Sequence, residues 1–125
     1  MLNKAAVVAT IAVKNLQRAK KFYTEVLGLK PSKAFPNGII MQAGTKTAVG
    51  LYHQPKNKVG HTVAWFTVAD FDKTVAQLLD KGVKFNRYDL PGYDELGEAI
   101  YKFGKTKVAW FSDSEGNILA ISGQF

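Results

Sequence analysis

The chain has 125 residues, of which 46% are hydrophobic and 22% charged, and its formal net charge is +7. This length and composition predict one compact domain with a buried core, since domains typically contain about 100–150 residues. Cysteine is absent, which excludes disulfide bonds and a cysteine nucleophile and limits any zinc site to His, Asp or Glu ligands. No stretch approaches the ~20 apolar residues of a membrane span, and we expect a cytoplasmic protein with no membrane partner.

The positive charge is concentrated in the first half of the sequence. Residues 1–64 contain ten Lys or Arg residues and one acid, Glu25, a net charge of +9, whereas residues 65–125 carry −2. A basic protein can bind nucleic acid or an acidic ligand. Because these lysines are spread over predicted helix and loop positions, we favour a solvated surface and expect no nucleic-acid partner. An anionic ligand, nucleic acid, and pairing of two copies through opposite halves are the alternatives.

The first half predicts a strand, a helix and three more strands. Ala6–Val13 is rich in β-branched residues and predicts a strand, although the run Ala5–Val13 also resembles the apolar core of a signal peptide. Asn15 is a good helix N-cap, and Gly28 suits the left-handed position that closes a helix. Between them an apolar stripe recurs at helical spacing, formed by Ala19, Phe22, Tyr23, Val26 and Leu27. The three strands that follow are predicted at Lys30–Phe35, Ile39–Ala43 and Thr47–Tyr52.

The second half repeats this order after a polar linker, His53–Gly60. A strand is predicted over His61–Val68, and Asp70 caps a helix that ends at Gly82. The helix stripe comprises Phe71, Val75, Leu78 and Leu79. Three further strands are predicted at Val83–Leu90, Lys107–Ser112 and Ile118–Ser122, with an acidic loop at Pro91–Gly97, and Ala99–Phe103 is a candidate for an additional short strand.

The two halves align as an internal repeat of β-α-β-β-β units. Superposing residues 11–16 on residues 66–71 aligns the caps Asn15 and Asp70, and Gly28 matches Gly82 after a one-residue slip. A repeat at this scale describes the fold. It predicts an α+β protein in which two sheet-and-helix units form a curved mixed sheet, with the helices on the convex side and a hollow on the concave side.

Three segments carry a family resemblance that covers nearly the whole chain. They are Asn15–Leu29, Val68–Phe71 and Trp110–Leu119, the last containing Asp113-Ser114-Glu115-Gly116-Asn117. With the repeat, they resemble the vicinal oxygen chelate superfamily, which includes glyoxalase I, extradiol dioxygenases, fosfomycin-modifying enzymes and bleomycin-binding resistance proteins. Ser114 departs from the family, which usually has proline there. The resemblance implies a single glyoxalase/bleomycin-resistance-like domain over 1–125, with module one at 5–53, a linker at 54–60, module two at 61–125, and a cup lined by the concave sheet.

In metal-using members of this superfamily, His or Glu side chains from four strands hold a divalent ion in the cup. Counting from the shared motifs, the resemblance assigns these positions here to Val8, Gly50, Val63 and Ala120. None of the four side chains has a donor atom. We therefore predict that this chain has no metal centre and no cofactor.

The two histidines allow three interpretations. His61 lies two residues before Val63 and would share its face in a regular strand, and His53 lies at the linker. They could be ordinary surface residues, contact a ligand, or form a two-histidine site with an acid from residues 89–98. No Ser-His-Asp spacing or paired-carboxylate motif supports catalysis, and we interpret the acids of that segment, Asp89, Asp94, Glu95 and Glu98, as a solvated loop. No catalytic residue is predicted.

Alternation along the strands predicts which side chains line the cup. The aromatic and hydroxyl side chains suit a flat apolar or aromatic ligand held by stacking and a few hydrogen bonds. Alternatively, Trp65 and Trp110 fill a small cup as core. Around the Pro91-Gly92 loop, Tyr88 and Tyr93 could close over the cup. The predicted ligand-binding residues are Thr10, Tyr52, His61, Trp65, Thr67, Tyr88, Tyr93, Trp110 and Ser122.

These features favour a metal-free protein that sequesters a small organic molecule, as the bleomycin-type relatives do. The first alternative is a divalent-metal lyase, isomerase or dioxygenase of glyoxalase type with displaced ligands. The second is a partner- or nucleic-acid-binding module that uses the basic first half. By family analogy we expect a homodimer, with the cup formed within one chain or between two.

Overall fold

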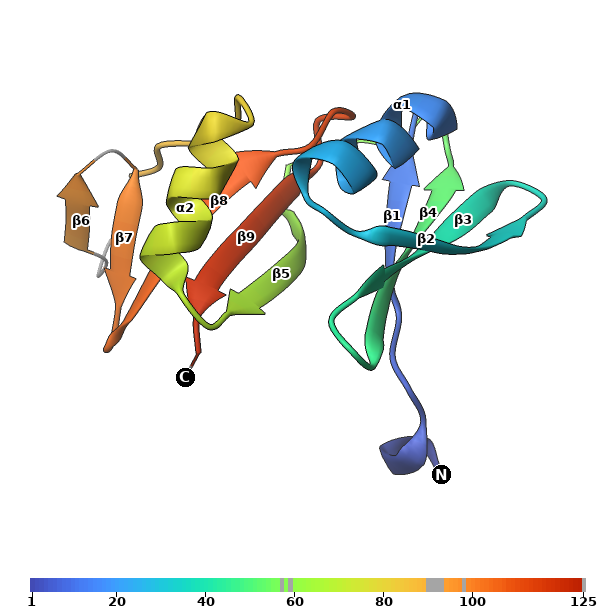
Figure 1. The fold of residues 1–125 in the computed structure, drawn as a ribbon, viewed down its shortest axis with the longest axis horizontal. Helices are drawn as coiled ribbons and strands as arrows, with labels where there is room; N and C mark the ends of the chain where they lie inside the picture. Colours follow the sequence, from blue (N-terminus) through green and yellow to red (C-terminus); the bar gives the residue numbers. More distant parts are fainter. Residues whose placement is uncertain (57, 59, 90–93, 98, 125) are drawn as a thin grey trace. The chain divides into compact units, whose positions relative to one another are not determined.

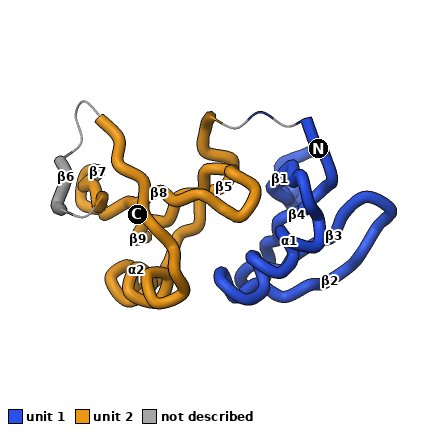
Figure 2. The backbone as a smooth tube through the Cα atoms, turned by 90° about the horizontal axis from the view of Figure 1, so that it is seen from above, with its two compact units in different colours: residues 1–59 blue, residues 60–125 orange. Residues whose placement is uncertain are grey.

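The computed structural model describes residues 1–56, 58, 60–89, 94–97 and 99–124. The chain divides into unit 1, Met1–Val59, and unit 2, Gly60–Phe125 (Figure 2). Each unit contains one mixed β-sheet and a helical segment, as the α+β prediction requires. Among the described residues, no helix is both long enough and apolar enough to cross a membrane.

Unit 1 is a four-stranded sheet in the order β1-β4-β3-β2 (Figure 1). Strand β1 runs parallel to β4, and the other neighbours are antiparallel. The elements are η1 (Leu2–Lys4), β1 (Ala9–Val13), α1 (Leu16–Lys21), η2 (Phe22–Val26), β2 (Lys30–Phe35), β3 (Gly38–Ala43) and β4 (Thr47–His53). The sequence predicted β2, β3 and β4 to within one residue and began β1 three residues too early, since residues 6–8 are not part of the strand.

One face of the unit 1 sheet is its hydrophobic core. Ile11 and Val13 of β1, Met41 of β3 and Leu51 of β4 are fully buried, and Ala19 and Tyr23 of the helical segment are fully buried with them. The alternation of side chains along a strand places Thr10 and Tyr52 on the opposite face of this sheet. The fold thus leaves a second face of unit 1 without helix cover.

The first helix begins as predicted and ends differently. The Asn15 side chain accepts a hydrogen bond from the Arg18 backbone N–H at 2.9 Å, which confirms the N-cap. The α-helix stops at Lys21 and continues as a π-helical turn over Phe22–Val26, in which the Leu27 N–H donates to the Phe22 carbonyl. Gly28, with φ of 76°, then ends the segment. Apolar spacing over one turn does not distinguish these two helix types, so the sequence predicted one continuous helix.

Unit 2 is a five-stranded sheet in the order β5-β9-β8-β7-β6. Strand β5 runs parallel to β9, and the remaining neighbours are antiparallel (Figure 1). The elements are β5 (Thr62–Val68), α2 (Phe71–Asp80), β6 (Asp94–Gly97), β7 (Ile100–Phe103), β8 (Thr106–Ser112) and β9 (Ile118–Gly123).

Two predictions in unit 2 are wrong. Over the predicted strand Val83–Leu90, the described residues form only an isolated bridge between Phe85 and Phe111. Of the predicted loop Pro91–Gly97, residues 94–97 are strand β6, which pairs with β7; residues 90–93 lie outside the described residues. Strand β7 pairs with the first residues of β8, Thr106–Val108. The segment after α2 therefore pairs with β8 only near the end of that strand, at Phe111.

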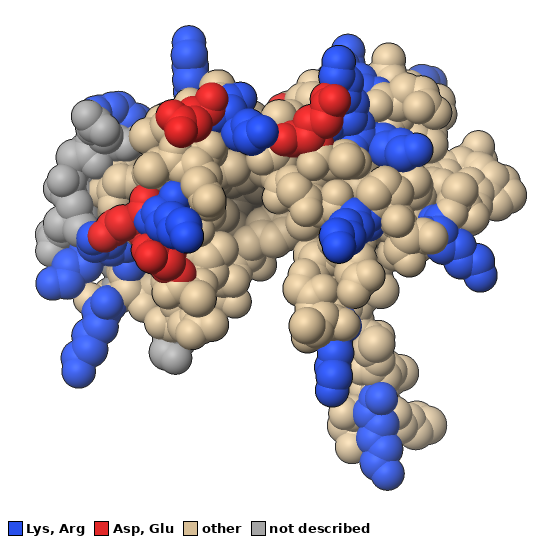
Figure 3. Space-filling model, in the orientation of Figure 1, with Lys and Arg blue, Asp and Glu red and all other residues tan. Residues whose placement is uncertain are grey.

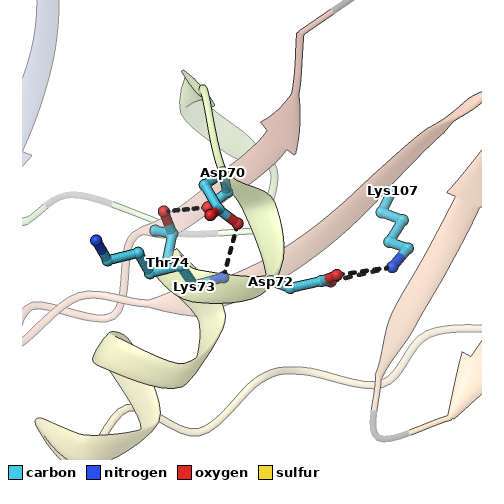
Figure 4. A network of polar contacts seen from close by, with 5 residues as sticks. All are labelled: Asp70, Asp72, Lys73, Thr74 and Lys107. Carbon is cyan, nitrogen blue, oxygen red and sulfur yellow. Dashed lines mark hydrogen bonds and ion pairs between the residues drawn. The ribbon is translucent and has the colours of Figure 1, made fainter.

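Polar contacts fix the start of α2 and show which side of the sheet it covers (Figure 4). Asp70 caps the helix by accepting from the Lys73 N–H at 3.1 Å, and the Thr74 hydroxyl donates to the Asp70 carbonyl at 2.8 Å. Lys107 of β8 donates to both carboxylate oxygens of Asp72, at 3.0 and 3.2 Å. Lys107 therefore lies on the face that α2 covers, and its neighbour in sequence, Val108, lies on the opposite face.

Candidate functional site

The face of the unit 2 sheet opposite α2 carries two rows of side chains that cross neighbouring strands. In the first row, Trp65 of β5 pairs with Ala120 of β9, which pairs with Trp110 of β8. In the second, Thr67 pairs with Ser122, which pairs with Val108. We call this surface the aromatic face, defined by Trp65, Thr67, Val108, Trp110, Ala120 and Ser122. Four predicted ligand-binding residues, Trp65, Thr67, Trp110 and Ser122, thus share one face.

Trp65 is an exposed side chain in a fixed position. Its indole is 52% exposed, yet its Nε1–H donates to the Ser122 hydroxyl at 2.8 Å. Ser122 is fully buried and donates in turn to the Gly123 carbonyl at 2.8 Å. Ala120, which lies beside Trp65 and two residues before Ser122, is only 3% exposed. An indole that reaches from β5 to Ser122 covers this alanine and presents a fixed aromatic surface.

Trp110 belongs to an aromatic cluster at the other end of the row. The ring centroids of Tyr88 and Trp110 lie 5.7 Å apart at an interplanar angle of 89°, and those of Tyr101 and Trp110 lie 5.7 Å apart at 62°. The Tyr101 hydroxyl accepts from the Tyr88 N–H at 2.7 Å and donates to the Tyr88 carbonyl at 3.0 Å. Tyr101 itself is buried with Ala99 and Val108. Trp110 is therefore partly a core residue, as the alternative interpretation of the sequence allows.

A polar cluster lies next to Trp110. The Asn86 side chain donates through Nδ2 to the Tyr88 hydroxyl at 3.0 Å and to the Ser112 hydroxyl at 3.4 Å. The Asn86 backbone N–H donates to the Trp110 carbonyl at 2.7 Å, which holds this segment against β8. Sequence reasoning identified Tyr88 and missed Asn86. The two residues are two positions apart in a segment that the sequence predicts as a strand, and residues with this spacing share a face. That spacing is the signal that could have identified Asn86.

The remaining predicted residues lie in unit 1, before β5, or outside the described residues. Thr10 and Tyr52 belong to unit 1, on the face of its sheet without helix cover, and Tyr93 lies outside the described residues. His61 precedes β5 and is exposed. The pairing of β5 with β9 shifts between Thr62 and Ala64, and this bulge around Val63 breaks the regular alternation that placed His61 on the same face as Val63.

The four positions that the family resemblance assigns to metal ligands, Val8, Gly50, Val63 and Ala120, have no donor atom in their side chains. A Cβ atom on Gly50 would lie 3.4 Å from Ile40 Cδ1 and 3.8 Å from Val8 Cγ1, so Val8 and Gly50 are neighbours in unit 1. Ala120 lies beneath Trp65, and Val63 lies at the bulge. Among the described residues, no three His, Asp or Glu side chains gather where they could hold one ion. Within the part of the chain that the structure describes, these four positions therefore supply no donor atom for a divalent ion.

The buried acids of unit 2 form a turn between β8 and β9. The Asp113 carboxylate accepts hydrogen bonds from the N–H groups of Glu115 and Asn117, each at 2.8 Å, and from the Asn117 side chain at 3.0 Å. Ser114, in the place of the family's usual proline, donates to the Glu115 carboxylate at 2.9 Å. These contacts give the segment a structural role.

Comparison with solved structures finds the same fold in proteins of low sequence identity. A glyoxalase/bleomycin resistance protein/dioxygenase from Alicyclobacillus acidocaldarius is 18% identical with a TM-score of 0.70, covering 98% of this chain and 92% of that one. Lactoylglutathione lyase from Agrobacterium tumefaciens is 16% identical with a TM-score of 0.67, covering 95% and 93%. The fosfomycin resistance protein FosX from Listeria monocytogenes is 9% identical with a TM-score of 0.71, covering 98% and 94%.

These similarities show the fold alone, and a search of curated proteins gives no match. A family model, described as the Glyoxalase/Bleomycin resistance protein/Dioxygenase superfamily, matches residues 5–121. That range includes both helices and every described strand up to residue 121 of β9. The repeated units, the motifs and this match agree: the chain belongs to the Glyoxalase/Bleomycin resistance protein/Dioxygenase superfamily.

Proposed function

We propose that this protein binds a planar apolar or aromatic small molecule on the aromatic face of unit 2, without a metal ion and without catalysing a reaction. The observation that carries the proposal is Trp65, whose indole is 52% exposed and is nevertheless fixed by Ser122. A large aromatic side chain held in one orientation binds a flat ligand at little entropic cost. Stacking of two aromatic groups contributes about 0.5–1.5 kcal/mol beyond the area that it buries.

The metal positions support binding without a metal. The solved structures of similar fold include a lactoylglutathione lyase and a fosfomycin resistance protein, but Val8, Gly50, Val63 and Ala120 supply no metal ligand here. Trp65 covers one of these positions, Ala120, so the same place in the sheet presents an aromatic surface.

Saturation-transfer NMR with a panel of two- and three-ring aromatic compounds tests the proposal. We expect compounds of this panel to bind the wild-type protein and Trp65→Ala to weaken their binding about tenfold, a loss of about 1.4 kcal/mol. Leu79→Ala is the matched control, because Leu79 is also a large exposed apolar residue, at 48%, but lies on α2. Absence of binding across the panel, or equal losses in both variants, would contradict the proposal.

Equilibrium dialysis against Ni²⁺, Zn²⁺, Mn²⁺ and Fe²⁺ tests the metal-free part separately. We expect less than stoichiometric binding of each ion and no lyase, isomerase or dioxygenase activity when the ion is added. One tightly held ion per chain, together with such activity, would favour an enzyme of glyoxalase type with displaced ligands.

We also propose a cytoplasmic homodimer, on family analogy and on the distribution of charge. Unit 1 carries +9 and unit 2 carries −2, and basic side chains predominate over unit 1 in Figure 3. Sedimentation velocity should give twice the chain mass of 13.8 kDa, with a dimer that weakens as salt rises. A monomer at all concentrations would contradict the dimer, and salt-sensitive binding to DNA would favour a nucleic-acid-binding module.

A further inference from the structure

We infer that the cluster formed by Asn86, Tyr88 and Ser112 selects ligands that carry a carbonyl oxygen on the aromatic ring. This inference rests on the proposed function and names a chemical class for its ligand, an aryl ketone, aldehyde or quinone. It assigns to Asn86 the role of positioning the two hydroxyl groups.

In the cluster, the hydroxyl hydrogens of Tyr88 and Ser112 point away from Asn86. An asparagine amide has two N–H donors, and here the Nδ2 atom of Asn86 donates to the Tyr88 hydroxyl at 3.0 Å and to the Ser112 hydroxyl at 3.4 Å. Each hydroxyl accepts from the amide through its oxygen, so its own hydrogen points elsewhere. Both hydroxyl oxygens bind one nitrogen atom, at 3.0 and 3.4 Å, so a ligand oxygen placed beside the cluster can accept a hydrogen bond from either of them.

The position of the cluster suits a ligand that stacks on the aromatic face. Ser112 follows Trp110 by two residues on β8 and shares its face, and the Tyr88 ring contacts the Trp110 ring edge-on. Trp65 and Trp110 are separated by one strand, so their backbones lie about 10 Å apart, two strand spacings. A two-ring compound that lies over Ala120, between Trp65 and Trp110, can direct a substituent past Trp110 toward Ser112.

The chemistry of the donors favours a neutral acceptor over an anion. The three side chains of the cluster are uncharged, and unit 2 as a whole has a net charge of −2. A carboxylate would lose hydration without gaining a cationic partner from these three side chains. A carbonyl oxygen loses less hydration and gains one or two hydrogen bonds from the hydroxyls, and this difference leads us to aryl ketones rather than aryl acids.

Two isosteric probes test the inference. 2-Acetylnaphthalene and 2-isopropenylnaphthalene have the same shape and differ in one C=O against one C=CH₂ group. Titration calorimetry with the full chain should show the ketone binding about threefold to tenfold more tightly, the gain expected for one or two net hydrogen bonds. The anion 2-naphthoate should bind more weakly than the ketone.

Variants of the three cluster residues test which side chains produce the preference for the ketone over the alkene. Tyr88→Phe keeps the ring that contacts Trp110 and removes only the hydroxyl, so it should lower the ketone-to-alkene affinity ratio toward one while leaving the alkene affinity unchanged. Ser112→Ala should act in the same direction, Ser112→Thr should restore the ratio, and Asn86→Ala should lower it without removing either hydroxyl. Ser32→Ala, which removes an exposed hydroxyl from β2 of unit 1, is the matched control and should leave the ratio unchanged.

The outcomes separate this inference from the proposed function. Equal affinities for ketone and alkene, or losses for both compounds in Tyr88→Phe, would overturn the carbonyl-selecting role while the proposed function stands. Tighter binding of 2-naphthoate than of the ketone would also overturn it. Failure of both naphthalene compounds to bind would contradict the proposed function and this inference together. If Asn86→Ala does not fold, the affinity ratio in Tyr88→Phe decides.

Discussion

Ala120 is a buried residue of β9 that lies beneath an aromatic surface. The family resemblance assigns this position to the last-strand glutamate, and here the alanine is 3% exposed between Trp65 and Trp110 in the sheet. A carboxylate at this position would be buried beside two indoles, and burial of an unpaired charge is among the most costly substitutions.

We predict that Ala120→Glu lowers the free energy of unfolding by about 3 kcal/mol or more, measured by urea denaturation. Ala120→Met is the control for size, because it adds a comparable volume without a charge and should cost less. A glutamate variant as stable as the wild type, or one stabilised by Zn²⁺ or Mn²⁺, would contradict this explanation.

Ser122 determines the orientation of Trp65. Its hydroxyl accepts the indole N–H and is itself buried. We predict that Ser122→Ala costs about 1 kcal/mol of stability, the net worth of such a hydrogen bond, and that the indole N–H then exchanges faster with solvent. NMR of the Trp65 side-chain resonance measures the exchange rate, and Ser32→Ala supplies the comparison. An unchanged rate would mean that packing alone holds the ring.

At the scale of the helices, the two N-caps are equivalent positions of the repeat. Asn15 accepts from the Arg18 N–H at 2.9 Å, and Asp70 accepts from the Lys73 N–H at 3.1 Å. We predict that Asn15→Ala and Asp70→Ala each lower the free energy of unfolding by about 1 kcal/mol. Gln17→Ala, an exposed change just inside the first helix, should be neutral in chemical denaturation. If both variants lower the free energy of unfolding by less than a few tenths of a kcal/mol, the explanation that both positions are stabilising N-caps of the repeat is contradicted.

Local sequence signals predicted the helix starts, the closing glycines and most strands. Side-chain capping and the positive φ values of Gly28 and Gly82, 76° and 89°, depend on neighbouring residues in the chain, so the sequence contains the necessary information. The interior strands β4 and β9 are recognisable because consecutive residues in the middle of each strand are buried and thus give continuous apolar runs.

The errors arose where pairing between distant residues decides the structure. Strand β6 is formed by the acidic segment Asp94–Gly97, and its pairing with β7 prevails over the low strand propensity of aspartate and glycine. The shift in pairing beside Val63 depends on β9, so counting along β5 could not place His61. Asn86 was missed because its importance depends on Tyr88 and Ser112, and the latter is 26 residues away.

At the scale of the whole molecule, the net charge divides at the boundary between the two units. Unit 1 carries +9 and unit 2 carries −2, so mutual repulsion of like charges opposes the folding of unit 1 much more than that of unit 2. We predict that raising NaCl from about 0.02 M to about 0.5 M, which screens this repulsion, slows amide hydrogen exchange in the sheet of unit 1 more than in unit 2. Equal changes in both units would contradict the prediction.

The chain has two tryptophans, Trp65 and Trp110, and both lie in the sheet of unit 2. Intrinsic fluorescence excited at the red edge of the indole band therefore reports the melting of unit 2 alone, whereas far-ultraviolet circular dichroism reports strands from both units. Heating curves recorded by the two probes coincide if the units unfold in one cooperative step and separate if they unfold independently.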